Sequence, residues 1–146
     1  LERGSLLHDI GKIGISDTIL HKPGKLTDEE WKIMKVHPDI GARIIERIPF
    51  LQECMTVVHY HHERWDGSGY PFGLKGQDIP LQARIFAVAD VFDALTSKRS
   101  YRKKSSPDDA VNYLREQANI LFDPDIVDAL AKLPYAEFIQ AEKTTP

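Results

Sequence analysis

Histidine and aspartate side chains recur in the first two thirds of this 146-residue chain, in types and groupings that suit metal binding. Imidazole nitrogens and carboxylate oxygens are ligands of hard to borderline divalent metals. A segment rich in glycine, tyrosine and proline follows the densest group. Together these residues predict an enzyme that holds a cluster of ions and presents a phosphate to it. The candidate ligands are His8, Asp9, His37, His61, His62 and Asp90.

The His8-Asp9 pair could serve one ion only near a helix end. Adjacent positions on a helix point about 100° apart, because one turn holds about 3.6 residues. Gly11 supplies a plausible helix end, and Lys12 lies on the same side as Asp9, where it could meet a phosphate. The alternatives are ordinary. A single His-Asp pair is more often a surface pair without a role, and a lysine at a helix end often interacts only with the helix dipole.

The other candidates differ in weight. His37 precedes a proline, and such a histidine is more often a turn residue than a ligand. His61 and His62 are stronger evidence, because paired imidazoles beside a carboxylate are uncommon by chance. Asp90 lies in an apolar run, so we expect it to be partly buried. A buried carboxylate is costly unless it is paired or binds metal, and the alternative to metal is pairing with an arginine or a backbone amide.

Helices must position these side chains, because apolar residues recur at helical spacing and no alternating run of useful length indicates a strand. Thr27 and Glu30 form a capping box that starts one helix, and the proline after His37 marks a helix boundary. Ser106 and Asp123, each followed by proline, are further helix starts. We therefore predict an all-α fold. The expected helices cover approximately residues 6–10, 15–20, 27–36, 40–48, 51–61, 81–96, 106–119 and 126–133.

Residues 66–80 form the least regular segment, with several glycines and prolines. A loop this long inside a compact domain is usually functional or disordered. Its glycines are placed to let the backbone approach another group closely. We therefore expect a rigid, shaped loop after the paired histidines.

Composition limits the classes of function. The hydrophobic content of 42% and the charged content of 28% are ordinary for a soluble globular protein, and the length predicts one domain over residues 1–146. A net charge of −3 argues against binding of polymeric nucleic acid, which needs a basic surface.

The single cysteine, Cys54, excludes an intrachain disulfide and sites with several thiolates, and we expect it to be a buried filler. No membrane-spanning run or signal peptide is visible, so a cytoplasmic location is expected.

Several longer motifs contain the candidate residues. They are Leu7-His8-Asp9-Ile10-Gly11-Lys12-Ile13-Gly14, His37-Pro38-x-x-Gly41, His61-His62-Glu63-Arg64-x-Asp66-Gly67-Ser68-Gly69-Tyr70-Pro71, Ile79-Pro80, Ala89-Asp90-x-Phe92-Asp93-Ala94-Leu95-Thr96 and Arg99-x-Tyr101-Arg102. In order and spacing they resemble an HD-GYP domain, a branch of the HD superfamily of metal-dependent phosphohydrolases. The resemblance runs from Leu6 to about Leu133 and is specific, because all the motifs agree.

The resemblance implies an HD-type helical bundle with an extended GYP loop and two or three divalent ions, most typically iron or manganese. It implies that His8, Asp9 and Asp90 bind one ion. It also implies that Asp9 bridges to a second ion, which His37 and His61 bind. His62 would serve the second ion or a third.

The resemblance also implies a substrate, cyclic di-GMP, a bacterial second messenger hydrolysed to linear pGpG or onward to GMP. Asp9 and Lys12 would then be the catalytic residues. The residues implied to contact the substrate are Lys12, Gly69, Tyr70, Asp93, Arg99 and Arg102.

Members of this family usually carry further helices and ligands before the His-Asp pair, so we expect the sequence to be a piece of a longer protein. A receiver or sensor domain upstream and GGDEF-type partner proteins are expected from the same resemblance. A homodimer is expected because the apolar stripe of Leu6, Leu7 and Ile10 would be uncovered without those helices. Two alternatives stay open: a catalytically weak or inactive regulatory module of the same fold, and a hydrolase that acts on another cyclic dinucleotide.

Overall fold

The computed structural model describes residues 1–97 and 105–135. Two compact units are present, Leu1–Phe86 and Ala87–Pro146, and each is described by itself. Two of the predicted substrate contacts, Arg99 and Arg102, lie outside the described residues. That residues 1–146 form one domain stays a prediction.

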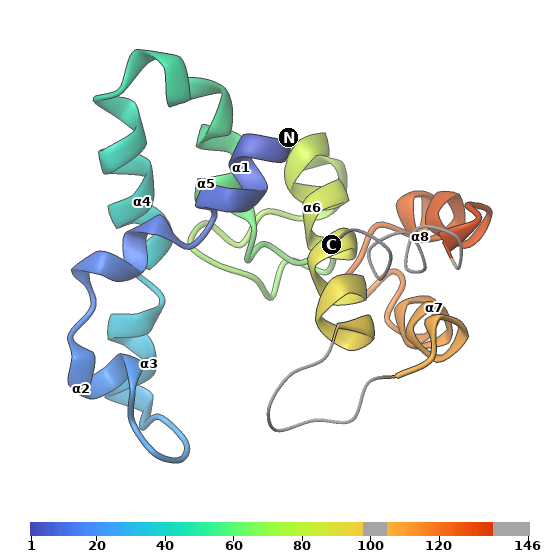
Figure 1. The fold of residues 1–146 in the computed structure, drawn as a ribbon, viewed down its shortest axis with the longest axis horizontal. Coiled ribbons are helices and arrows are strands. Elements are labelled where there is room, and N and C mark those ends of the chain that lie inside the picture. Colours follow the sequence, from blue (N-terminus) through green and yellow to red (C-terminus); the bar gives the residue numbers. More distant parts are fainter. Residues whose placement is uncertain (98–104, 136–146) are drawn as a thin grey trace, which may run out of the picture. The chain divides into compact units, whose positions relative to one another are not determined.

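The described ranges are helical and contain no strand, only an isolated bridge between Ala118 and Phe122. The all-α prediction is therefore confirmed there. In the first unit the elements are α1 (Glu2–Leu7), the 3-10 helix η1 (Ile10–Gly14), α2 (Asp17–Leu20), α3 (Asp28–Met34), α4 (His37–Glu46), η2 (Pro49–Cys54), α5 (Met55–Tyr60) and η3 (Gly76–Asp78) (Figure 1). The helix α6 (Leu81–Thr96) runs from the first unit into the second, which also contains α7 (Pro107–Glu116) and α8 (Pro124–Ala131).

The predicted helix starts are confirmed by their capping contacts. The Glu30 amide donates to Thr27 Oγ1 at 3.3 Å, and the Thr27 amide donates to the Glu30 carboxylate at 2.7 Å, which completes the capping box. The Ser106 side chain caps α7, and the Asp123 side chain caps α8, each directly before a proline. Proline suits this first position because the amide that it lacks would have no helical partner there.

Two helices differ from the prediction. The segment expected as one helix over 51–61 is a 3-10 helix, η2, followed by the short helix α5. Apolar spacing does not separate these two forms over so few residues. Near the start, α1 ends at Leu7, and Gly11 lies inside η1 rather than at a helix end. The backbone therefore turns just where His8 and Asp9 stand.

Glycine at two positions lets the elements of the first unit come close. A Cβ on Gly11 would collide with the His37 carbonyl at the start of α4, and a Cβ on Gly41 would lie 2.7 Å from the Val58 side chain of α5. These distances are too short for any other residue. The two glycines therefore bring η1, α4 and α5 together, and the predicted ligands lie on or beside these three elements.

A buried apolar cluster in the first unit supports this arrangement. Ile45, Cys54 and Val58 form its centre, with Leu7, Ile10, Leu51 and Met55 packed against it. Cys54 is a free, buried side chain, as predicted. Leu6, by contrast, is 80% exposed.

The second unit has its own buried cluster, in which Val88 of α6 packs with residues of α7 and α8: Leu114, Phe122 and Val127. The residue at the start of α8, Asp123, is buried as well as capping. Across the described ranges, no helix is long and apolar enough to cross a membrane.

Candidate metal centre

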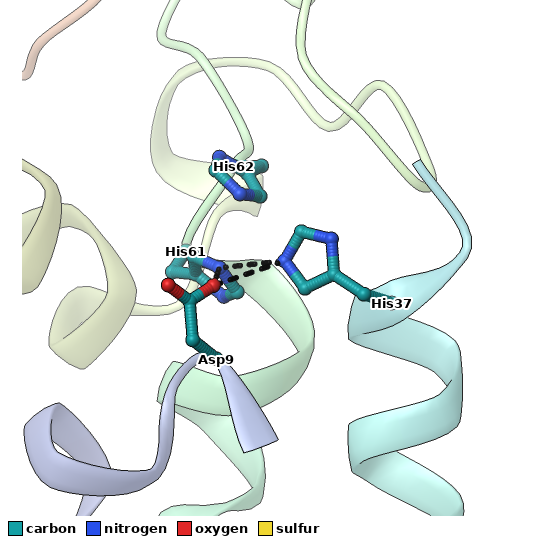
Figure 2. A group of neighbouring side chains, drawn as sticks. All are labelled: Asp9, His37, His61 and His62. Atoms are coloured by element: carbon teal, nitrogen blue, oxygen red, sulfur yellow. Dashed lines mark hydrogen bonds and ion pairs between the residues drawn. The ribbon is translucent and has the colours of Figure 1, made fainter. Parts of the chain in front are cut away.

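Four of the predicted ligands meet in the first unit. Asp9, His37, His61 and His62 each offer a ligand atom, and these atoms all lie within 4.8 Å of one another (Figure 2). Asp9 precedes η1, His37 begins α4, and the two adjacent histidines follow α5. His37 and His61 are buried, whereas Asp9 and His62 are partly exposed. The set is open on one side, as a site that must admit a substrate needs to be.

The backbone fixes which ring nitrogen of three histidines faces the centre. In His8, His37 and His61, the Nδ1 atom lies 2.6, 2.8 and 3.0 Å from the carbonyl oxygen three residues earlier in the chain. A carbonyl oxygen can only accept, so each Nδ1 carries a hydrogen and donates it. The Nε2 atom of each ring is then the one that can bind an ion, which is the common arrangement of metal-binding histidines.

The Nε2 atoms of His37 and His61 lie only 3.3 Å apart. With a proton already on each Nδ1, two neutral rings present two lone pairs to each other and repel, and a hydrogen bond between them needs one ring to carry a positive charge. The nearer carboxylate oxygen of Asp9, Oδ1, is 3.3 Å from the first and 3.8 Å from the second. A divalent cation that binds both nitrogens and this oxygen removes the conflict, so the donor set fits a metal ion.

The second oxygen of Asp9 faces a different pair of groups. Oδ2 lies 3.2 Å from His8 Nε2 and 2.6 Å from Lys12 Nζ. Burial raises the pKa of the Asp9 carboxyl, but its side-chain contacts with His37, His61, His8 and Lys12 outweigh burial and hold this pKa well below its ordinary value. Asp9 is therefore a carboxylate with one oxygen on each side of the site.

His62 lies beside this group and differs in environment. Burial, together with the nearby imidazoles of His61 and His37, lowers the pKa of His62 to about 2. The ring is thus neutral near pH 7, which is the form that binds metals. Tyr70 stacks on it, with ring centroids 4.6 Å apart, and burial and the Asp9 carboxylate raise the pKa of Tyr70 to about 12. Tyr70 is therefore a neutral phenol beside the cluster.

Glu63 is a buried acid that the sequence reasoning did not single out. Its side chain accepts hydrogen bonds from the backbone amides of Phe72, at 2.8 Å, and Leu74, at 2.9 Å, and the residue is only 4% exposed. Gly69 packs so close to the Glu63 backbone that a Cβ would lie 2.5 Å from its Cα. These contacts fold the 66–80 segment back on the end of α5, and the close approach of a glycine is made to the Glu63 backbone. The signal available in the sequence was an acidic residue placed between the paired histidines and a glycine-rich segment.

Two further candidates belong to the second unit. Asp90 and Asp93 lie on the part of α6 that belongs to the second unit, and both are exposed. The expectation that Asp90 is partly buried is therefore wrong. Its neighbour Val88 faces the buried cluster, and Asp90, two residues further along the helix, points elsewhere. Ser97 donates a hydrogen bond of 2.7 Å to Asp93.

Comparisons with known proteins agree with the metal-binding geometry of the cluster. The family profile described as HD domain matches residues 1–126. The chain is 52% identical over 134 residues to the cyclic di-GMP phosphodiesterase response regulator RpfG of Xanthomonas campestris. It is 50% identical over 129 residues to a cyclic di-GMP phosphodiesterase of Thermotoga maritima, and 43% identical over 148 aligned residues to 3′3′-cGAMP-specific phosphodiesterase 2 of Vibrio cholerae.

These matches cover 90%, 87% and 100% of this chain but only 35%, 35% and 28% of the relatives, so the chain spans about a third of their length. Among solved structures, the cyclic GMP-AMP phosphodiesterase V-cGAP3 of V. cholerae aligns with a TM-score of 0.64 at 20% identity, over 97% of this chain and 41% of that one. The protein Bd1817 of Bdellovibrio bacteriovorus, described as an HDG"Y"P protein, aligns with a TM-score of 0.61 at 23% identity, over 86% of this chain and 40% of that one. These likenesses show an HD-type fold.

Proposed function

Because this chain belongs to the HD domain family and is related to cyclic di-GMP phosphodiesterases, we propose that it carries the metal centre of a phosphodiesterase that hydrolyses a cyclic dinucleotide. One observation carries the proposal. The Nε2 atoms of His37 and His61 face each other at 3.3 Å, with a carboxylate oxygen of Asp9 beside both. Such a donor set fits a divalent cation, which supports the proposal.

The proposed centre holds two or three divalent ions, iron or manganese. His37, His61 and the Oδ1 side of Asp9 would bind one of them. His8 and the Oδ2 side of Asp9 would bind another, together with Asp90, and His62 would complete the set. Ions at such a site supply Lewis acidity, which polarises phosphoryl oxygens and makes water nucleophilic near neutral pH. Asp9 can serve two ions because its two oxygens face different histidines.

The proposed roles of the other residues follow from charge and position. Lys12 holds its ammonium 2.6 Å from Asp9, close enough to neutralise a phosphate oxygen brought to the centre. Arg99 and Arg102 are proposed to bind the other phosphate oxygens, and Asp93 is proposed to contact the substrate. Gly69 and Tyr70 belong to the proposed GYP loop. Because Tyr70 stacks on His62, it can restrict the movement of the His62 ring and of a substrate bound beside it.

Cyclic di-GMP is the first candidate substrate, with pGpG or GMP as product, because two of the relatives above are named for it. A specific observation favours 3′3′-cGAMP as a second candidate: the match that covers 100% of this chain is to an enzyme named as specific for that nucleotide. We further propose a receiver or sensor domain in the same protein, since one relative is named a response regulator. GGDEF-type proteins and a second copy of the chain are proposed partners.

The test is a hydrolysis assay on metal-loaded protein with cyclic di-GMP and 3′3′-cGAMP in parallel. We expect release of a linear dinucleotide or mononucleotide from at least one of them. Asp9→Ala should lose both metal and activity, whereas Asp17→Ala, an exposed aspartate of α2, should retain both. Full metal loading with no hydrolysis of either nucleotide would instead favour a regulatory module.

A further inference from the structure

A cavity of about 470 Å³ opens directly beside the metal centre. His37 and His62, two of the clustered ligands, form part of its lining. Lys12, His21 and Tyr70 also line the cavity, and its apolar wall comes from the α2–α3 region: Leu20, Leu26, Trp31 and Met34. A cavity of this size, with a mostly apolar wall and a few polar groups at one end, is typical of a site for a small organic ligand.

Trp31 is the notable member of this wall. It is 46% exposed, so much of its indole is available to a ligand, although a tryptophan is usually far more buried. No part of the proposed chemistry at the metal ions requires an indole at this position. An exposed aromatic surface that lines a cavity beside a phosphate-binding centre suits a flat aromatic ring.

The segment that carries Trp31 is held in place before any ligand arrives. The neighbouring residue, Glu30, accepts a hydrogen bond of 2.6 Å from Lys22, which follows α2, and the same carboxylate oxygen accepts one of 2.7 Å from the Thr27 amide. One carboxylate therefore ties the start of α3 to the preceding turn. Preorganisation of this kind lowers the cost of ordering the wall on binding.

We propose that this cavity is the base subsite of the substrate, in which a purine ring of the cyclic dinucleotide stacks on Trp31. The proposal rests on the function proposed above and adds a specificity-determining residue to it. A substrate whose phosphate lies at His37 and His62 must place a neighbouring ribose and base within a few ångströms of them, and the cavity is continuous with these two residues. Lys12, also in the lining, provides the cation at the phosphate end.

The test compares three variants in the metal-loaded protein. Trp31→Ala removes the stacking surface, Trp31→Phe keeps an aromatic ring, and Ile33→Ala changes an exposed apolar residue of α3 that does not line the cavity. Base stacking on an aromatic side chain changes affinity by roughly five- to a hundredfold when it is removed. We expect Trp31→Ala to raise KM for the cyclic dinucleotide by about this factor, with kcat and metal content little changed. Trp31→Phe should stay within a few-fold of wild type, and Ile33→Ala should match wild type.

A binding measurement separates this subsite from the proposed activity. Isothermal titration calorimetry with GMP, and with ribose 5-phosphate as the probe without a base, needs no turnover. Trp31→Ala should weaken GMP binding and leave ribose 5-phosphate binding as it is. If the protein is inert on both cyclic dinucleotides but GMP binding depends on Trp31, the proposed activity fails and the subsite stands. If Trp31→Ala hydrolyses the substrate with unchanged KM and binds GMP as wild type does, the subsite is wrong and the activity stands.

Discussion

Truncation of Glu63 is the substitution whose effect follows most directly from the structure. In Glu63→Ala, the backbone amides of Phe72 and Leu74 lose the carboxylate that accepts their hydrogen bonds at 2.8 and 2.9 Å. Each donor left without a partner in a part-buried place costs about 1–3 kcal/mol. The two together should therefore lower the free energy of unfolding by about 2–6 kcal/mol, at the lower end if water reaches the amides.

Glu63→Ala should also disturb the metal centre, because the loop that it releases carries Tyr70. The carboxylate folds the 66–80 segment so that the Tyr70 ring stacks on His62 at 4.6 Å. Without it, the loop should open locally, and the protein should bind metal and substrate less well. Glu63→Gln retains one acceptor oxygen and should fall between wild type and alanine. Glu46→Ala, which changes an exposed glutamate of α4, is the matched control and should shift stability by less than about 0.5 kcal/mol.

Urea unfolding gives the stability, and amide hydrogen exchange reports on the loop itself. We expect faster exchange at Phe72 and Leu74 in Glu63→Ala than in Glu46→Ala. If the two variants have the same unfolding free energy and the same exchange at these two amides, the carboxylate does not hold the loop and this reasoning is refuted.

Three further predictions address other parts of the molecule. Gly11→Ala places a Cβ against the backbone carbonyl of the first residue of α4, so its melting temperature and metal content, measured by calorimetry and elemental analysis, should both fall. Arg99→Ala and Arg102→Ala remove proposed phosphate contacts, each worth roughly 1.5–3 kcal/mol, so steady-state kinetics should give a KM about ten- to a hundredfold higher with metal content intact. Hydrogen bonds from Lys22 and from the Thr27 backbone amide hold the pKa of the Glu30 carboxyl below 4.5. The ionised Glu30 should therefore stabilise the fold above pH 4.5, and this contribution should be lost as the pH falls through the lowered pKa. In Lys22→Ala, an NMR titration of Glu30 should give a midpoint nearer 4.5.

Much of the cluster could be predicted from residue types and motif order. The four clustered ligands were all among the predicted set, and the close spacing of Asp9 to both His37 and His61 follows from helices brought together by glycines that the motifs contain. Capping residues gave the helix starts because side chain and backbone interact locally there.

Other features depend on contacts between distant residues and could not be predicted. The chain bends at His8 because η1 packs against α4, and hydrophobic spacing carries no information on that contact. Asp90 is exposed because helix phase, rather than its apolar neighbours, decides which way it points. Glu63 gains its role only when the 66–80 segment folds back over it, which requires the whole loop to be in place.

Asp9 and its histidines are proposed to hold the ions that are required for hydrolysis of a cyclic dinucleotide. The most direct test is a titration of manganese or ferrous ion into metal-free protein under anaerobic conditions, with release of linear product from cyclic di-GMP and 3′3′-cGAMP as the readout. Activity should be absent without metal, rise with bound ion and saturate at two or three ions per chain, and Asp9→Ala should stay inactive at every concentration. Hydrolysis that is independent of metal, or equal in the Asp9→Ala protein, would contradict the account.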